Sequence, residues 1–275
     1  MDSIKIVVDS SSNLTSLEGV DFGCAPLKIN TEKMEYTDTA ELDVNDMVNT
    51  LYRYTGKSST SCPNLTDWLT AFGDAERIVC FTITSNLSGS YNSAYKAKEL
   101  YEAEHPDRRV LVVDSLSAGP EIALIAEKCR ELILLGKSLD EIEKDLALYK
   151  TELLFVLESM KNLANNGRIS KLAATAAGVL GVRAVGKASD EGTLEMLSKC
   201  RGASKALQSL VEHAKALGYK GGKMRLSHCQ NESFAKDFAA KIRTEFTDAK
   251  IVIEECRALC SFYAEKGGML VGFEV

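Results

Sequence analysis

Length, composition and charge exclude several classes of protein: the chain has 275 residues, 45% hydrophobic and 26% charged, and its 33 basic and 39 acidic residues give a net charge of −6 with no basic tail or stripe. This balance suits a globular protein with one large or two average domains, and it argues against nucleic-acid binding because phosphate contacts need clustered Lys and Arg. Because no apolar run approaches the ~20 residues that span a bilayer, and the acidic N-terminal segment does not resemble a signal peptide, we expect a cytoplasmic protein without a membrane span.

The first half of the sequence alternates short apolar runs with amphipathic segments. Runs typical of buried parallel strands lie at residues 4–8, 78–82 and 110–113, and a further strand is expected within 20–29. Helices are predicted over 43–54, around Trp68, from about 88 to 104, over 120–135 and over 139–149, with a polar loop at 57–64. This order predicts an open, mostly parallel sheet with helices on both faces.

The second half has a mixed order of elements. An apolar stretch at 153–157 precedes a turn at 167–170 and a small-residue helix over 172–180. Further elements are predicted in the order strand 182–187, strand 193–199, helix 203–217, strand 224–228, helix 231–246, strand 250–254 and strand 269–274. We therefore expect an α/β class protein with two domains, an N-terminal α/β domain over 1–150 and a C-terminal mixed α+β domain over 151–275.

Clusters of hydroxyl and acidic residues follow the predicted strands of the first sheet. They read DSSS at 9–12, TSNLSGS at 84–90 and DS at 114–115, and a further cluster, TSCPN, precedes a helix at 60–64. Ligands of parallel sheets bind at the carboxyl ends of strands, and helix N-termini suit anions. Ordinary helix capping explains the clusters about as well, and the acids argue against a polyphosphate ligand without a metal.

Other chemistries find little support in the sequence. None of the eight cysteines forms a C-x-x-C pair and the three histidines lack metal-ligand spacing, so we favour reduced thiols over disulfides or metal ligands. The segment GVRAVGKA at 181–188 nearly matches a phosphate-binding loop, but Ala188 replaces the required hydroxyl and the interior alternates like a strand, which indicates a chance match. A G-x-S-x-G nucleophile elbow is missing from the sequence.

Taken in order, the motifs resemble those of the DegV family over nearly the whole chain. The segment DSSSNL at 9–14 resembles the family's D-S-S-S-D-L, TSCPN at 60–64 resembles T-S-Q-P-S, and LSGSYNSA at 87–94 resembles L-S-G-T-Y-Q-S-A. The segments VDS at 113–115 and NGRIS at 166–170 follow in the family order. Each motif is short, but five in sequence are specific.

The resemblance implies two α/β domains that hold a long-chain, palmitate-like fatty acid between them. Family members are similar to the binding subunits of bacterial fatty acid kinase, in which a separate ATP-dependent kinase phosphorylates the exposed carboxylate. It further implies a carrier, not an enzyme, with no catalytic residue, no metal and no cofactor, and with transient membrane contact for lipid exchange.

The resemblance also implies roles for individual residues. Thr60 or Ser61, with Ser88 and Gly89, would hold the carboxylate. On the same basis Arg168 and Arg201 match arginines that serve kinase docking or phosphotransfer, although solvated arginines next to turn glycines are the ordinary interpretation.

The C-terminal segment departs from the family pattern. The family ends with H-x-G-P-G, whose histidine lies near the carboxylate, whereas Tyr263 stands at that position here. A tyrosine can still donate a hydrogen bond, so we include Tyr263 in the expected site. Two alternatives stay open: an enzyme for a small phosphorylated or carboxylated metabolite, with Asp9 or Asp114 as base, and a lipid sensor without a kinase partner.

Overall fold

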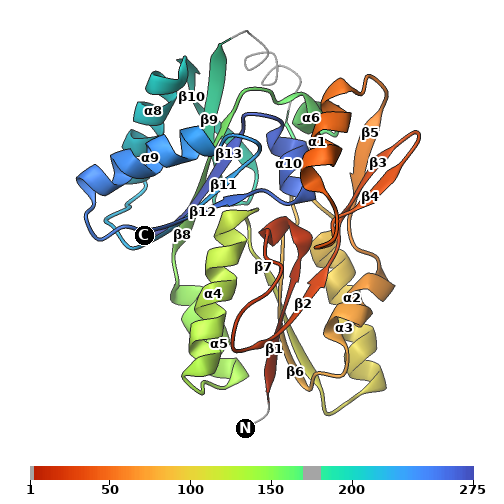
Figure 1. Ribbon diagram of the computed structural model, residues 1–275. Helices are drawn as coiled ribbons and strands as arrows, with labels where there is room; N and C mark the ends of the chain where they lie inside the picture. The colour runs from red at the N-terminus through yellow and green to blue at the C-terminus, as the bar shows by residue number, and fades with distance from the viewer. Residues whose placement is uncertain (1–2, 170–180) are drawn as a thin grey trace.

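The first half of the chain forms the parallel sheet that the sequence predicts. In the computed structural model, which describes residues 3–169 and 181–275, four strands lie in the order β2–β1–β6–β7 (Figure 1). Each neighbouring pair is parallel, with β7 at one edge and β2 at the other. The strands are β1 Ile4–Asp9, β2 Asp21–Ala25, β6 Arg77–Thr82 and β7 Arg109–Asp114, and a short 3-10 helix, η1 Ser10–Ser12, follows β1.

Helices cover both faces of this sheet because its strands are apolar on both sides. On β1, Val7 points into one hydrophobic cluster and Ile6 into the other. Helices α2 and α3 pack on the Val7 face, and α4 and α5 on the Ile6 face. Their bounds are α2 Leu65–Phe72, α3 Ser90–Glu104, α4 Pro120–Leu134 and α5 Leu139–Leu148.

A small antiparallel sheet lies beside the parallel one and corrects the sequence-based prediction. It has the order β4–β3–β5, with β3 Lys28–Thr31, β4 Glu35–Thr37 and β5 Ser58–Ser61, and helix α1 Val44–Arg53 precedes β5. The polar loop predicted over 57–64 is therefore wrong for its first half. Pairing with β3, in which Ile29 lies opposite Thr60, makes this hydroxyl-rich segment a strand despite its composition.

The second half forms a six-stranded mixed sheet in the order β10–β9–β8–β13–β11–β12. Only β11 and β12 pair in parallel among these described strands. The segment that resembled a phosphate-binding loop is β9 and pairs with β10 as a hairpin, which agrees with a chance match. The strands are β8 Thr151–Leu157, β9 Val182–Ala188, β10 Leu194–Arg201, β11 Lys223–His228, β12 Lys250–Glu255 and β13 Met269–Glu274.

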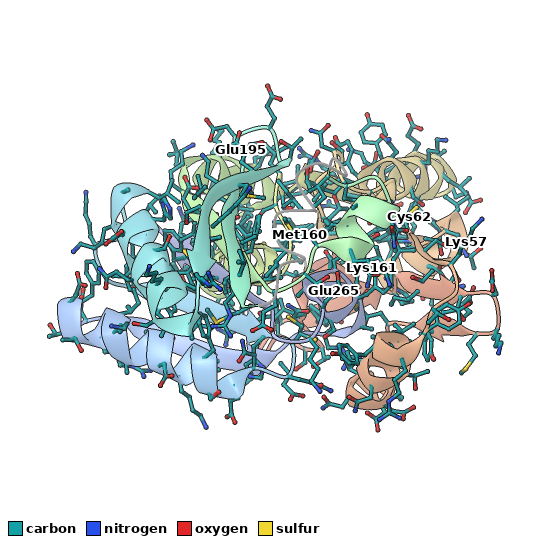
Figure 2. The ribbon with its side chains drawn as sticks, turned by 90° about the horizontal axis from the view of Figure 1, so that it is seen from above. Lys57, Cys62, Met160, Lys161, Glu195 and Glu265 are labelled. Atoms are coloured by element: carbon teal, nitrogen blue, oxygen red, sulfur yellow. The ribbon has the colours of Figure 1, made fainter. Side chains whose placement is uncertain are left out.

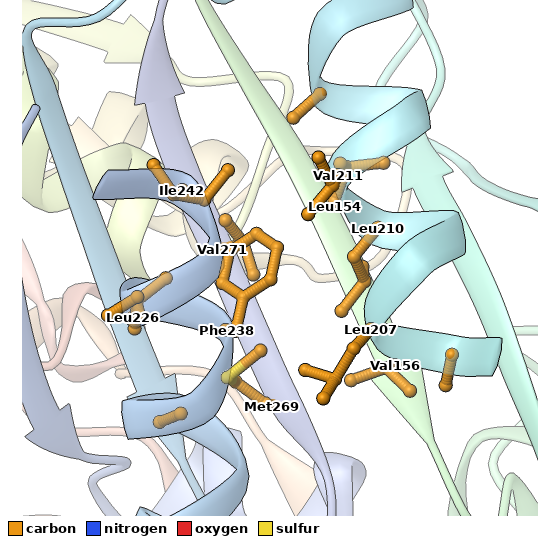
Figure 3. Close-up of a cluster of buried hydrophobic side chains, with 14 of the residues drawn as sticks. Leu154, Val156, Leu207, Leu210, Val211, Leu226, Phe238, Ile242, Met269 and Val271 are labelled. Atoms are coloured by element: carbon orange, nitrogen blue, oxygen red, sulfur yellow. The ribbon is translucent and has the colours of Figure 1, made fainter. Parts of the chain in front are cut away.

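Alternation along β8 decides which side chains face the first half of the molecule. Leu154 and Val156 point toward α8 (Ala203–Ala216) and α9 (Glu232–Glu245), which cover the outer face of this sheet. Figure 3 shows this cluster, with side chains from β8, β11, β13 and both helices meeting in one core. Because neighbouring strand residues point to opposite faces, Leu153, Phe155 and Leu157 are turned to the inner face.

The two halves are joined by several contacts. Helix α4 contacts β1 of the first sheet and also β13 of the second, and the turn between β9 and β10 reaches the first half, where Asn86 Nδ2 donates to the Glu191 carbonyl at 2.6 Å. Two short helices, α6 Lys161–Asn165 and α10 Ala258–Ala264, complete the junction.

The domain boundary near residue 150 stays a prediction. Helix α10 belongs to the second half by sequence but packs against α1 and β3 of the first half. The helix expected over 172–180 lies outside the described residues. Among the helices described, none is both long enough and apolar enough to cross a membrane.

Candidate functional site: a cavity between the two sheets

A mostly apolar cavity lies between the carboxyl edge of the parallel sheet and the inner face of the mixed sheet. The free space between its walls, including the part open to solvent, is about 690 Å³. Leu27, Ile83 and Ala118 follow β2, β6 and β7 and form one wall. The remaining lining residues come mainly from β8, β13, α10 and the loops around them: Thr60, Leu87, Ser88, Leu153, Phe155, Leu157, Leu163, Arg168, Leu194, Leu259, Cys260, Tyr263, Ala264 and Leu270.

Four polar side chains in this lining come from distant parts of the chain. Thr60 lies on β5, Ser88 precedes α3, Arg168 follows α6 and Tyr263 lies in α10. The Thr60 and Tyr263 hydroxyls are 2.7 Å apart, a hydrogen bond in which either can donate. The guanidinium of Arg168 stacks 5.9 Å from the centre of the Tyr263 ring, which is within reach of a cation–π interaction.

The Tyr263 hydroxyl remains a hydrogen-bond donor at neutral pH. Burial raises the pKa of this phenol above its ordinary value, against smaller lowering effects of the Thr60 hydrogen bond and the Arg168 charge. The Arg168 Nε donates to the Leu87 carbonyl at 3.0 Å, and its NH1 donates to the Asn166 carbonyl. Two backbone carbonyl oxygens therefore hold the Arg168 side chain in place. The other three polar side chains of the cluster carry uncharged hydroxyl groups.

A buried carboxylate, Asp38, fixes the start of helix α10 and so helps to position Tyr263. The sequence analysis did not identify this residue. Asp38 accepts hydrogen bonds from the backbone N–H groups of Ala258 and Leu259, at 3.0 and 2.9 Å, and lies 3.6 Å from Arg257. A carboxylate at the start of a helix satisfies N–H groups that have no partner within the helix. The start of α10 is thereby tied to the segment between β4 and α1.

Three residues expected at the site lie elsewhere. Ser61 follows Thr60 on β5, so its side chain points to the opposite face, where it is exposed and accepts a hydrogen bond from Asn30 at 3.3 Å. Gly89 is exposed at the start of α3, where an added Cβ would lie 3.3 Å from Cys62 Sγ. Arg201 is exposed at the end of β10 and does not line the cavity. Of the pair Thr60 and Ser61, only Thr60 faces the cavity.

The two acids considered as catalytic bases are engaged in the loops of the first sheet. Asp9 is fully buried, accepts from Ile83 N at 2.9 Å and Ser90 Oγ at 2.6 Å, and does not line the cavity. Burial is the largest effect on its carboxyl and raises its pKa. Asp114 accepts from the Ser85 N–H at 3.1 Å. Both carboxylates hold backbone turns in place, which weakens the interpretation as a metabolite enzyme.

One cysteine, Cys260, lines the cavity. All eight cysteines are free, and Cys24 and Cys62 are the two that are not fully buried. Among the described residues, His, Cys, Asp and Glu side chains do not gather in a group that could hold a metal ion. Figure 2 shows Met160, Lys161 and Glu265 where the two halves meet, with Cys62 on one side and Glu195 on the other.

Comparisons with known proteins point to one family. A family model described as "Uncharacterised protein, DegV family" matches residues 3–274. A DegV domain-containing protein of Streptococcus pneumoniae strain R6 is 42% identical over 277 residues, which cover 98% of this chain and 99% of the relative.

Solved structures agree with this match. A DegV family protein from Eubacterium eligens, loaded with heptadecanoic acid, has a TM-score of 0.97 and 40% identity, and the match covers 99% of this chain and 100% of that chain. The Streptococcus pneumoniae fatty acid kinase (Fak) B3 protein, loaded with linoleic acid, has a TM-score of 0.97 and 42% identity over 99% of both chains.

Proposed function

Because the chain belongs to the DegV family, we propose that it binds a long-chain fatty acid in the cavity and presents the carboxylate to a separate ATP-dependent fatty acid kinase. The observation that carries this proposal is a mostly apolar cavity whose polar cluster pairs Thr60 with Tyr263. The solved relatives loaded with heptadecanoic and linoleic acids support the class of ligand.

The apolar lining suits an acyl chain on energetic grounds. A sixteen-carbon chain has roughly fifteen methylene equivalents, and burying each contributes about 0.8 kcal/mol, or on the order of 12 kcal/mol in all. Association and ordering offset about 4–15 kcal/mol of this gain. Affinity therefore depends strongly on how well the carboxylate is received.

The polar cluster offers a largely neutral setting for the carboxylate. Ser88 and one hydroxyl of the Thr60–Tyr263 pair can donate to its oxygens, since the proton of the other stays in their mutual hydrogen bond. Hydrogen bonds to a charged group contribute ~1.5–3 kcal/mol each. Tyr263 thus takes the place at which the family has histidine. Hydroxyl donors neutralise less of the carboxylate charge than a bidentate arginine would, so its oxygen stays available to attack a phosphoryl group.

The residues that line the cavity and the name of one solved relative support a kinase partner. The described residues that line the cavity include no carboxylate or histidine that could act as a base, which supports presentation over catalysis by this chain. The Fak B3 relative is a fatty acid kinase component by name. Arg168 beside Tyr263 and the exposed Arg201 are the proposed contacts for the kinase, and a cytoplasmic location belongs to the same proposal.

Native mass spectrometry of freshly purified protein, followed by denaturing extraction and lipid analysis, tests the binding step. A stoichiometric fatty acid is expected. If none copurifies and none is taken up when offered, the proposal fails and the metabolite enzyme becomes the leading alternative.

Adding an ATP-dependent fatty acid kinase and following acyl phosphate formation tests presentation. Lipid carriage without phosphorylation by any such kinase would favour a lipid sensor.

A further inference from the structure

Three side chains of β8 mark positions along the cavity. Leu157, Phe155 and Leu153 all line it, and alternate residues of a strand lie ~6.6–6.8 Å apart, so the row spans roughly 13 Å. Leu157 stands at the end of β8 that leads into α6, from which the chain continues to Arg168. Leu153 stands at the opposite end of the row, near the start of β8.

A second hollow begins where this row ends. It is a surface groove along β7, the edge strand of the parallel sheet, and its walls include Val113, Ile125, Leu146 and Glu121. The opposite edge strand is β2, which leads along the chain into β3 of the small sheet (Figure 1), and β3 pairs with the Thr60 strand β5. Leu153 is the single residue that lines both the cavity and the groove among the described residues.

Leu153 lies between the cavity and the groove, and Glu121 lines the groove side. Leu153 is 1% exposed, and the neighbouring Glu121 carboxyl accepts hydrogen bonds from Thr151 at 2.7 Å and from Ser117. Gly272 lies opposite Leu153 on β13, and an added Cβ there would lie 2.6 Å from the Glu121 backbone nitrogen. The backbone of α4 therefore packs closely against β13 next to Leu153, and Leu153 is the described side chain that the cavity and the groove share.

From this geometry we infer that Leu153 is the barrier that limits the length of the acyl chain. The inference rests on the proposed function and deepens it, because it assigns one residue to the selection among fatty acids. An acyl chain that reaches Leu153 meets its side chain first and the hydrogen-bonded Glu121 carboxyl next. Replacing Leu153 by a smaller residue joins the cavity to the groove, whose Val113, Ile125 and Leu146 side chains offer apolar surface to a longer chain.

The test compares Leu153→Ala with Leu157→Ala on delipidated protein. Both leucines are on β8 and almost fully buried, at 1% and 2% exposure. Leu153 lines the cavity and the groove, whereas Leu157 lines the cavity but not the groove. Each protein is offered an equimolar series of saturated and cis-monounsaturated fatty acids from about 14 to 22 carbons, and native mass spectrometry reports which are bound. Leu153→Val, a milder truncation, guards against misfolding, and circular dichroism confirms the fold of each variant.

We expect Leu153→Ala to move the upper length limit by at least two carbons. The gain for a chain two methylenes beyond the wild-type limit should be about tenfold relative to a chain at the limit, since each buried methylene contributes ~0.8 kcal/mol and ~1.4 kcal/mol is tenfold. Leu153→Val should move the limit in the same direction by a smaller step. Leu157→Ala should weaken all lengths with no change in the limit.

Two results would overturn the inference: length profiles of Leu153→Ala and Leu157→Ala that run parallel, or a wild-type limit retained in both Leu153 variants. A wild-type protein that takes up no fatty acid at all would instead refute the proposed function, so the two failures are distinguishable.

Discussion

At the scale of single residues, the contrast between Thr60 and Ser61 shows how a strand sorts neighbouring hydroxyls. The two are adjacent in sequence, yet Thr60 bonds to Tyr263 in the cavity while Ser61 is exposed beside Asn30. Tyr263 in turn packs edge-on against Phe262, with ring centroids 4.9 Å apart. The Thr60–Tyr263 pair of the polar cluster therefore depends on one face of β5 and one side of α10.

Removing the Tyr263 hydroxyl should weaken fatty-acid binding without disturbing its surroundings. Tyr263→Phe keeps the ring against Phe262 and Arg168 but loses a donor to the carboxylate, so affinity should fall about tenfold or more, as a hydrogen bond to a charged group contributes ~1.5–3 kcal/mol. Thr60→Val should act in the same direction. Displacement of a fluorescent fatty acid measures both.

Ser61→Ala is the matched control for these variants, and its affinity should equal that of the wild type. A loss in Ser61→Ala as large as in Thr60→Val would contradict the assignment of Thr60 as the inward-facing hydroxyl.

The sequence alone predicts part of this cluster. Motif resemblance identifies Thr60, Ser88, Arg168 and Tyr263, which all line the cavity. It does not separate Thr60 from Ser61, because that requires knowing that 58–61 is a strand and which face it buries. Asp38 has no local pattern that marks it, since its partners at the start of α10 lie some 220 residues further along the chain.

At the scale of elements, periodic segments follow their predicted bounds and irregular ones do not. Helix α4 and strand β13 differ from prediction by one residue or none, because their apolar patterns and end signals agree. Strand β5 was missed because its stability comes from pairing with β3. The row on β8 could not be assigned to a face either, since this strand is apolar on both sides and carries no alternating pattern.

The start of α4 should make stability depend on pH. Glu121, in the first turn, is almost fully buried and this burial raises its pKa from 4.5 to about 7, against lowering effects of Ser117 and Thr151. The folded protein therefore holds this proton more tightly than the unfolded chain. The protonated Glu121 side chain therefore contributes its full stabilisation below pH 4.5. This contribution to the free energy of unfolding, on the order of 3 kcal/mol, is lost as the pH rises to about 7.

Glu121→Gln should remove this dependence, because a neutral amide can accept from one of the Ser117 and Thr151 hydroxyls through its oxygen and donate to the other through its NH2 group. Urea unfolding between pH 4.5 and 8 should give a flatter profile for the variant, with a gain in stability over wild type above pH 7. Glu99→Gln, an exposed position in α3, is the control and should follow the wild type. Identical slopes in wild type and Glu121→Gln would refute the role of Glu121.

At the scale of the whole molecule, the cavity is made by both halves and by neither alone. Leu27, Ile83 and Ala118 come from the first sheet, and Leu157 and Leu270 from the second. A ligand that fills this space adds contacts to both halves at once. Bound lipid should therefore stabilise the fold as a unit, and its loss should loosen the junction first.

Loading a fatty acid should raise the melting temperature of delipidated protein. A ligand that binds only the folded state stabilises it by ~2.7 kcal/mol at about 100 times its dissociation constant, which corresponds to several degrees for a protein of this size. Differential scanning calorimetry with stearate, and with octanoate as a short-chain control, measures the effect. An equal shift with octanoate would show that the apolar length of the cavity is not used.

The hydrogen bonds that cross from one half to the other should also affect how fast a bound fatty acid dissociates. Arg168 is bonded to the Leu87 carbonyl, and Asn86 is bonded to the Glu191 carbonyl, so the same short loop is held at two adjacent points. We expect an acyl chain enclosed between the halves to leave after these contacts part. Its dissociation rate should then be set by an internal motion of the protein, so that two fatty acids of unequal affinity dissociate at similar rates.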